Sequence, residues 1–213
     1  MKKTSFAFAA LLACSAQAFA ADKNQGGTQN VYATMPVFSQ IVGFGFPASF
    51  VKGNEQGSAE QYILELVPKG ESVDNWTQMI TLTGAKDLVE KGATPDKILG
   101  FIADNFKKSC PDSFQAANLG EFKINGFPGQ GALISCGSTK AKPMSETAMV
   151  IALQGEKDFY TLQWAEHVKN SKSPLDTSGD SVKKWGSRQQ MLAPVRLCAR
   201  VPGEQAPYPS CLK

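Results

Sequence analysis

The pattern of apolar and polar residues predicts β-strands in five segments of the chain. The segments are 61–67, 75–83, 131–137, 146–154 and 158–168. The alternation in the second segment places Trp76, Ile80 and Leu82 on one face of its strand. The fourth segment is almost wholly apolar, which predicts a central strand, and the fifth is predicted to be a long strand and the final one of the chain.

Helical spacing of apolar residues predicts three helices. The clearest has Thr94 as its N-cap and Pro95 at its first position, and it extends to about Lys108. Its predicted packing face consists of Ile98, Phe101, Ile102 and Phe106. A shorter helix is predicted over 85–91, with Gly92 as its stop. The last is predicted over 181–192, and the residues expected to face the body are Val182, Trp185, Gln189 and Leu192.

Strands grouped in hairpins with helices between the groups favour an α+β fold, with a single antiparallel sheet and helices packed against it. We expect one domain over residues 31–213, preceded by a flexible polar leader over 21–30. The glycine-rich stretches Gly43–Pro47 and Gly126–Gly131 lack the spacing and the strand-to-helix context of a phosphate-binding loop. They are predicted to be turns or irregular edge strands.

Residues 1–20 have the features of a secretory signal peptide: a basic pair, an apolar run over 6–13 and the small-x-small ending Ala18-Phe19-Ala20. The apolar run is about eight residues, whereas a membrane span needs about twenty. We expect cleavage after Ala20 and a periplasmic or secreted mature chain. The alternative is a lipoprotein, in which Cys14 of the stretch LLAC becomes the lipidated first residue.

Removal of the leader takes away two lysines and no acidic residue, so the formal charge falls from +3 by two. Proteins that bind nucleic acid or anionic membranes usually carry a basic excess, and this chain does not. We therefore expect neither nucleic acid nor a membrane surface as its partner.

Four cysteines belong to the expected mature chain: Cys110, Cys136, Cys198 and Cys211. In an oxidising compartment an even number indicates disulfides, with free buried thiols as the alternative. Three pairings are open. We favour Cys110 with Cys136 and Cys198 with Cys211, because each bond then closes a local loop and the second holds the proline-rich tail. The spacing matches no zinc site, and we expect no metal and no cofactor.

Catalytic signatures are weak in this sequence. His167 is the only histidine, and Ser135, Ser138 and Ser145 are the serines considered as its nucleophile. The Gly-x-Ser-x-Gly turn of many hydrolases does not occur. We therefore expect no catalytic residues, and a small envelope hydrolase with His167 as its base is the alternative.

Four phenylalanines are the candidate lining of an exposed apolar groove that could bind a ligand: Phe44, Phe46, Phe50 and Phe127. The other interpretation of these side chains is core packing.

Three stretches carry a resemblance to known proteins: GESVDNWTQMITLTG (70–84), DFYTLQWAE (158–166) and PYPSC (207–211). Through them the chain resembles small secreted or periplasmic proteins of Gram-negative bacteria that share an NWTQMIT-type strand and have no assigned function. The order of hairpin, Trp-bearing strand, crossing helix and late hairpin also resembles the PsbP-like α/β/α sandwich. That resemblance implies a non-enzymatic accessory or binding protein, so we expect a non-catalytic envelope protein that binds a protein or a small ligand.

Overall fold

The computed structural model describes residues 29–138, 144–175 and 179–212. Within them lie ten strands, two α-helices and a short 3-10 helix: β1 (Asn30–Val37), β2 (Gln40–Pro47), β3 (Phe50–Gly57), β4 (Gln61–Pro68), β5 (Gln78–Ala85), α1 (Pro95–Ser109), β6 (Phe114–Ile124), β7 (Phe127–Cys136), β8 (Met144–Gln154), β9 (Phe159–Lys169), α2 (Gly179–Leu192), β10 (Arg196–Ala199) and η1 (Pro209–Cys211). Three predictions fall outside these residues: the signal peptide, the alternative lipidation at Cys14 and most of the flexible leader. Asn30, which was assigned to that leader, belongs to β1.

Seven strands form the larger sheet, in the order β3-β4-β5-β9-β8-β7-β6. Every neighbouring pair is antiparallel. All five segments predicted to be strands lie largely in strands of this sheet, and the apolar segment 146–154 belongs to β8, inside the sheet as expected. The coarse expectation of an antiparallel α+β fold is therefore confirmed.

The expectation of a single sheet is wrong, because β1, β2 and β10 form a second, three-stranded antiparallel sheet. The short strand Arg196–Ala199 lies in the proline-rich tail and pairs with Gln40–Gly43. Its four residues are too few to show a periodic pattern. The long strand 159–169 is therefore not the last one.

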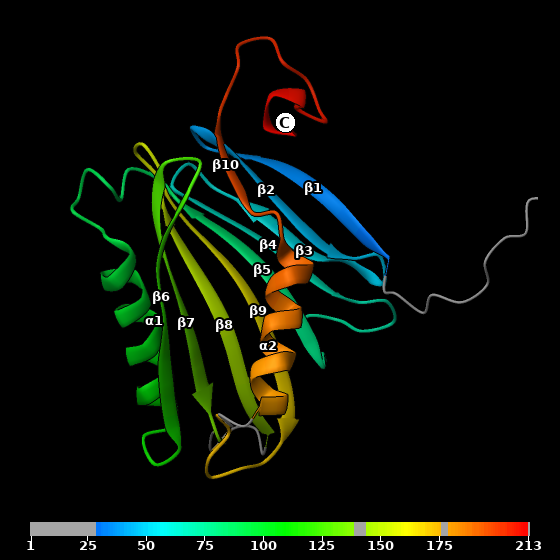
Figure 1. Cartoon of the computed structure of the whole chain (residues 1–213), viewed down its shortest axis with the longest axis vertical. Coiled ribbons are helices and arrows are strands. Elements are labelled where there is room, and N and C mark those ends of the chain that lie inside the picture. Colours follow the sequence, from blue (N-terminus) through cyan, green and yellow to red (C-terminus); the bar gives the residue numbers. More distant parts are fainter. Residues whose placement is uncertain (1–28, 139–143, 176–178, 213) are drawn as a thin grey trace, which may run out of the picture.

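The elements form layers on the two faces of the seven-stranded sheet (Figure 1). Helix α1 covers one face, where the core contains Leu99, Ile134, Ala148, Val150, Ala152 and Phe159. The other face packs against the three-stranded sheet and α2, and the largest buried side chains there include Phe44, Tyr160, Leu162, Trp164, Trp185 and Leu192. Because both faces are covered, β8 and β9 carry apolar residues on both sides.

Helix α1 begins at Pro95 as predicted, but its packing face differs from the expected one. Phe101 is 65% exposed, whereas Leu99 is buried. The helix is rotated about its axis so that Leu99 is the side chain buried against the sheet. Ile98, Ile102 and Phe106 are partly buried beside it. In α2, Trp185 and Leu192 are buried as expected, but Val182 is 64% exposed and Gln189 is also exposed.

The helix predicted over 85–91 does not form: Ala85 ends β5, and turns occupy 86–92. Asp87 has a φ of 56°, in the left-handed region that a continuous α-helix excludes. Its amide donates to Asp158 Oδ1 at 2.9 Å, so a tertiary hydrogen bond replaces the helical one.

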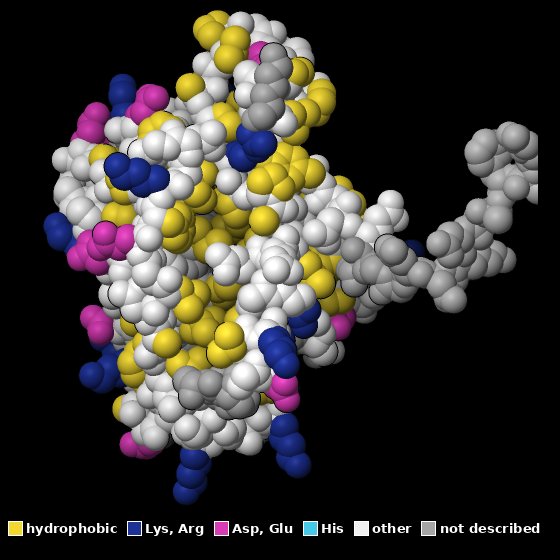
Figure 2. All heavy atoms as spheres, viewed as in Figure 1, with side chains coloured by type: hydrophobic (Ala, Val, Ile, Leu, Met, Phe, Trp, Pro, Cys, Tyr) yellow, Lys and Arg dark blue, Asp and Glu magenta, His cyan; other side chains and the backbone are white. Residues whose placement is uncertain are grey.

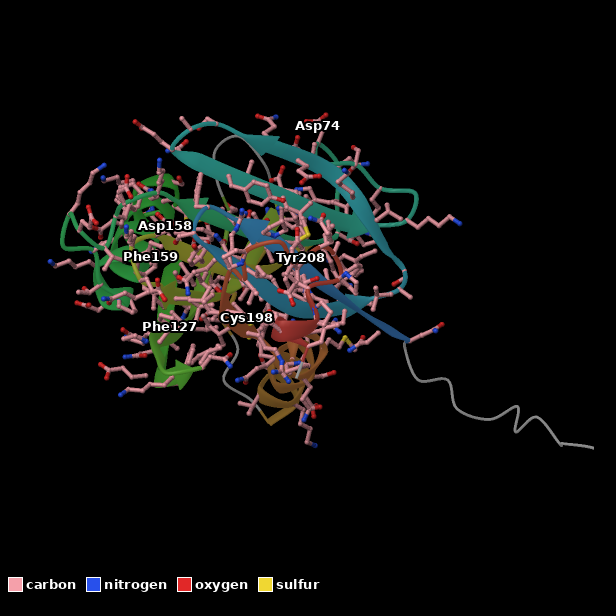
Figure 3. The ribbon with its side chains drawn as sticks, turned by 90° about the horizontal axis from the view of Figure 1, so that it is seen from above. Asp74, Phe127, Asp158, Phe159, Cys198 and Tyr208 are labelled. Carbon is pink, nitrogen blue, oxygen red and sulfur yellow. A yellow bond between two sulfur atoms is a disulfide. The ribbon has the colours of Figure 1, made fainter. Side chains whose placement is uncertain are left out.

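Asp158 is a buried carboxylate at the junction of the two sheets (Figure 3). Its Oδ2 accepts hydrogen bonds from the amide and the hydroxyl of Ser39, in the β1–β2 turn, at 2.9 and 2.5 Å. Burial raises the pKa of Asp158, but the hydrogen bonds from Ser39 and from the Asp87 amide outweigh this effect and bring the pKa below its ordinary value.

The two disulfides join Cys110 to Cys136 and Cys198 to Cys211, the pairing that we favoured. The second closes the C-terminal loop, in which Cys211 is buried and Tyr208 is partly buried (Figure 3). This loop contacts the three-stranded sheet through a 2.9 Å hydrogen bond from Thr34 Oγ1 to the carbonyl of Pro207. Among the described helices, none is long and apolar enough to cross a membrane.

Candidate functional site

One part of the seven-stranded sheet has an open apolar face. Figure 2 shows hydrophobic side chains gathered in a hollow between the β6 edge and α2, over β6, β7 and β8. Partly buried apolar residues line this hollow, which we call the apolar groove: Ala117, Phe122, Ile124, Phe127, Leu175, Met191 and Val195. Leu133 and Ile151, with exposed fractions of 9% and 7%, form its floor.

The groove carries no charge on the three strands beneath it. On β6 the acidic and basic residues Glu121 and Lys123 alternate with Phe122 and Ile124, so strand geometry turns both charges away from the groove. The register of β6 shifts between Asn118 and Gly120. This bulge brings Leu119, which is 49% exposed, to the groove side, where its Cβ lies 3.2 Å from the position of a Cβ added to Gly131.

Glycines make room for aromatic rings, which explains one glycine-rich stretch of the sequence. A Cβ added to Gly129 would collide with the ring of Phe122, which lies across β7. Only Gly126 belongs to a turn, with a φ of 87°, and the rest of this stretch lies in β7, inside the sheet. The stretch at Gly43–Pro47 likewise belongs to β2, the middle strand of its sheet, where Gly43 leaves room for the Tyr32 side chain. The expectation of turns or edge strands is therefore right for Gly126 and wrong for the rest of both stretches.

Both ends of the groove are closed by hydrogen bonds. At one end the segment 171–175 crosses from β9 toward β6, where the Leu175 amide donates to Gln115 Oε1 at 2.9 Å. The Ser171 amide donates to Ser145 Oγ at 2.8 Å in the same segment. At the other end the Leu197 amide of β10 lies 3.4 Å from Asn125 Oδ1 in the β6–β7 turn. The groove is therefore bounded by β6, α2 and these two contacts.

A row of polar side chains crosses the sheet beside the segment 171–175. Ser135 Oγ and Thr147 Oγ1 are 2.7 Å apart, and Thr147 is the register partner of Glu166 on β9. The Glu166 carboxylate is buried and binds two cations of α2, with 2.7 Å to Arg188 Nε and 3.1 Å to Lys184 Nζ. Two positive charges thus meet one negative charge at this corner.

A cavity of about 270 Å³ opens at the same corner. Its lining residues are Thr147, Glu166, Val168, Pro174, Asp180, Ser181, Lys184 and Trp185. The Arg188 guanidinium lies 5.0 Å from the ring centroid of Trp164, and Lys184 Nζ lies 4.8 Å from that of Trp185. Both cations therefore lie over aromatic rings as well as beside Glu166.

The four phenylalanines proposed as a groove do not come together in one. Phe44 is fully buried, and Phe50 packs edge-on against Trp164 at 5.5 Å, so both belong to the core. Phe46 is partly buried, with its ring 6.0 Å from that of Phe44. Of the four, Phe127 belongs to the apolar groove described above.

His167 lies away from the serines considered as its nucleophiles. Its Nδ1 is 3.0 Å from the Trp76 carbonyl, its Nε2 is 3.2 Å from Glu146 Oε2, and its ring stacks on Trp76 at 3.6 Å. Trp76 precedes β5 in the chain. It packs on the face of the sheet that α1 covers, not on the face of Ile80 as expected. Strand alternation places Ser135 and Ser145 on the opposite face of the sheet from His167, and Ser138 follows the end of β7.

The residues that define the groove were not identified from sequence, with the exception of Phe127. Phe122 and Leu119 lie in FQAANLGEFKI, where the bulge breaks the period of two. The available signal was the placement of Glu121 and Lys123 on one side of the strand, with Phe122 and Ile124 on the other. Among the described residues, no group of three or more His, Cys, Asp or Glu side chains could hold a metal ion.

Comparison with known proteins gives similarity at the level of solved structures alone. No protein-family model and no curated protein matches the chain. The chain is similar to the Ran-binding protein Mog1p of Saccharomyces cerevisiae, with a TM-score of 0.46, 10% identity, and coverage of 78% of this chain and 93% of that one. It is also similar to PsbP (CyanoP) of Synechocystis sp. PCC 6803, with a TM-score of 0.45, 9% identity, and coverage of 82% and 95%. Because both TM-scores lie below 0.5, neither similarity assigns a family or a function, and the NWTQMIT-type family stays a prediction.

Proposed function

We propose that the protein is a non-catalytic binding protein of the bacterial envelope, and that it holds the apolar part of a small ligand in the apolar groove. The observation that carries this proposal is the uncharged apolar floor over β6, β7 and β8, enclosed on its sides and ends. Exposed apolar surface is costly in water, and a bounded apolar hollow with a few polar groups at one corner is typical of ligand sites.

The envelope location is supported by the leader sequence and is compatible with the two disulfides. A hydrolase based on His167 is not favoured by any contact among the described residues. Both ring nitrogens of His167 face oxygen atoms, and neither Ser135 nor Ser145 lies on its side of the sheet.

A neutral fluorescent dye tests whether the groove binds an apolar ligand, because the dye carries no charge. We expect N-phenyl-1-naphthylamine to bind the purified protein with a blue shift and a stoichiometry of one, since the floor is apolar. The variant Leu119→Asp places a charge at the exposed edge of the groove and should weaken dye binding by about tenfold or more, which corresponds to about 1.4 kcal/mol.

The matched control is Phe101→Asp, which changes an exposed apolar residue of α1 on the other side of the sheet. It should leave dye binding unchanged, and circular dichroism should show that both variants are folded. Absence of saturable dye binding, or equal loss in the two variants, contradicts the proposed function.

A further inference from the structure

The apolar groove has a direction, because all three of its strands become polar at the same end. On β6 the groove side changes from Ile124 and Phe122 to Gln115, and on β7 it changes from Phe127 and Leu133 to Ser135. On β8 it changes from Ile151 to Thr147. The polar ends lie together, next to the segment 171–175 and the 270 Å³ cavity.

The apolar length suits an extended hydrocarbon chain. The eight steps from Phe127 to Ser135 span about 25 Å at the rise of a β-strand. The polar groups at the end of this path are already bonded to each other, as in the Ser135–Thr147 pair. A chain lying on this floor therefore leaves no buried polar group without a partner.

The polar corner carries an excess of positive charge. Lys184 and Arg188 both bind the single carboxylate of Glu166, and their side chains are 39% and 22% exposed. The other carboxylate that lines the cavity, Asp180, is 97% exposed and lies 3.9 Å from Lys183 Nζ. Water screens Asp180 far more than it screens the partly buried pair, so a head group at this corner meets a net positive field.

We infer that the ligand of the apolar groove is an anionic amphiphile with an acyl chain, whose chain lies over β6–β8 and whose negative head group lies beside Lys184. The inference rests on the proposed function and adds the chemical class of the ligand. Lys184 supplies the recognising charge, and Arg188 holds Glu166 in place from the next turn of α2.

Three amphiphiles with the same twelve-carbon chain and different head groups test the charge requirement. Isothermal titration calorimetry below the critical micelle concentration should show that laurate binds at least about tenfold more tightly than dodecyltrimethylammonium, a difference of about 1.4 kcal/mol. Dodecanol should bind with intermediate affinity, because it has the chain without the charge.

Lys184→Ala should weaken laurate binding by about five- to tenfold and leave dodecanol binding unchanged, while Lys184→Arg should retain laurate binding. Lys183→Ala is the matched control, since it removes the neighbouring lysine, whose side chain is 83% exposed and points to Asp180. It should change neither affinity.

Equal affinities for laurate and dodecyltrimethylammonium, or equal effects of Lys183→Ala and Lys184→Ala, would overturn this inference. If the neutral dye still binds in that case, the proposed function stands and the ligand is not selected by a negative charge. If neither the dye nor any dodecyl compound binds, both proposals fail.

Discussion

Asp158 shows at the scale of one residue how a buried charge joins parts of the chain that are distant in sequence. Its carboxylate accepts hydrogen bonds from Ser39 in the β1–β2 turn and from Asp87 in the loop before α1. Each of these donors is partly buried. The ionised carboxylate is therefore the form that the fold stabilises.

The lowered pKa of Asp158 predicts a specific dependence of stability on pH. The ionised carboxylate contributes stability above the pKa of the unfolded chain, near 3.9, and this contribution is lost as the pH falls through the lower folded pKa. We expect Asp158→Asn to lower the free energy of unfolding by about 1–3 kcal/mol at neutral pH. The loss in free energy of unfolding that this substitution causes should become smaller as the pH falls. Urea titrations between neutral and strongly acidic pH measure it.

Asp74→Asn is the control for this comparison, because Asp74 is exposed in the turn between β4 and β5 (Figure 3). It should change stability by less than about 0.5 kcal/mol at every pH. A penalty for Asp158→Asn that stays constant down to acid pH would contradict the role given to its charge.

Single residues also show what could not be predicted from the sequence. The donors Ser39 and Asp87 are 119 and 71 positions away from Asp158 in the sequence, so its neighbours in sequence did not mark it as a junction. The phenylalanines of the predicted groove were chosen for their aromatic character alone. Phe44 and Phe127 differ in burial because of the sheets in which they lie, and a single sequence does not show this.

At the scale of the element, α1 shows that the local sequence determines where a helix begins and ends, whereas packing determines how the helix is rotated about its axis. Thr94 and Pro95 mark the start of the helix, and the lysines before Cys110 mark its end. The rotation of the helix depends on which of its residues pack against the sheet. Leu99 and Ala103 lie on the packed side, whereas Gly100 and Phe101 are exposed, although Phe101 is the larger apolar side chain.

Two alanine substitutions measure this rotation. Leu99→Ala should lower the free energy of unfolding by about 2–3 kcal/mol, since Leu99 packs between α1 and the sheet. Phe101→Ala should change it by less than about 0.5 kcal/mol. Guanidinium denaturation followed by circular dichroism gives both values, and a larger loss for Phe101→Ala would mean that the helix has the orientation first predicted from sequence.

At the scale of the whole molecule, the apolar groove exists because the second sheet is smaller than the first. The three-stranded sheet and α2 cover much of the large sheet and leave the β6–β8 side open. The five inner strands of the large sheet were predicted from the sequence, whereas its edge strands β3 and β6 were not. The position of the smaller sheet was not, because it depends on β10, whose four residues pair with a strand more than 150 positions away.

The C-terminal loop is the element that holds β10 in this second sheet. Cys211 lies with its Sγ 4.0 Å from the Ile41 carbonyl of β2, and both side chains are buried. The bond between Cys198 and Cys211 closes a sequence separation of 13, which restricts the unfolded chain. The loop is therefore expected to stabilise the fold both through the unfolded state and through its cover over β2.

Replacement of both cysteines, Cys198→Ser with Cys211→Ser, should lower the free energy of unfolding by about 3 kcal/mol. Because the bond anchors β10, hydrogen exchange should rise first in Gln40–Gly43 and Arg196–Ala199 and remain slow in β8.

The control pair Cys110→Ser with Cys136→Ser should instead raise exchange near the end of α1 and in β7. Equal exchange in β2 for the two double variants would show that the tail does not hold the second sheet. Non-reducing peptide mapping of the native protein must also show the Cys198–Cys211 peptide, because a peptide linking Cys198 to Cys110 or Cys136 would remove the basis for this prediction.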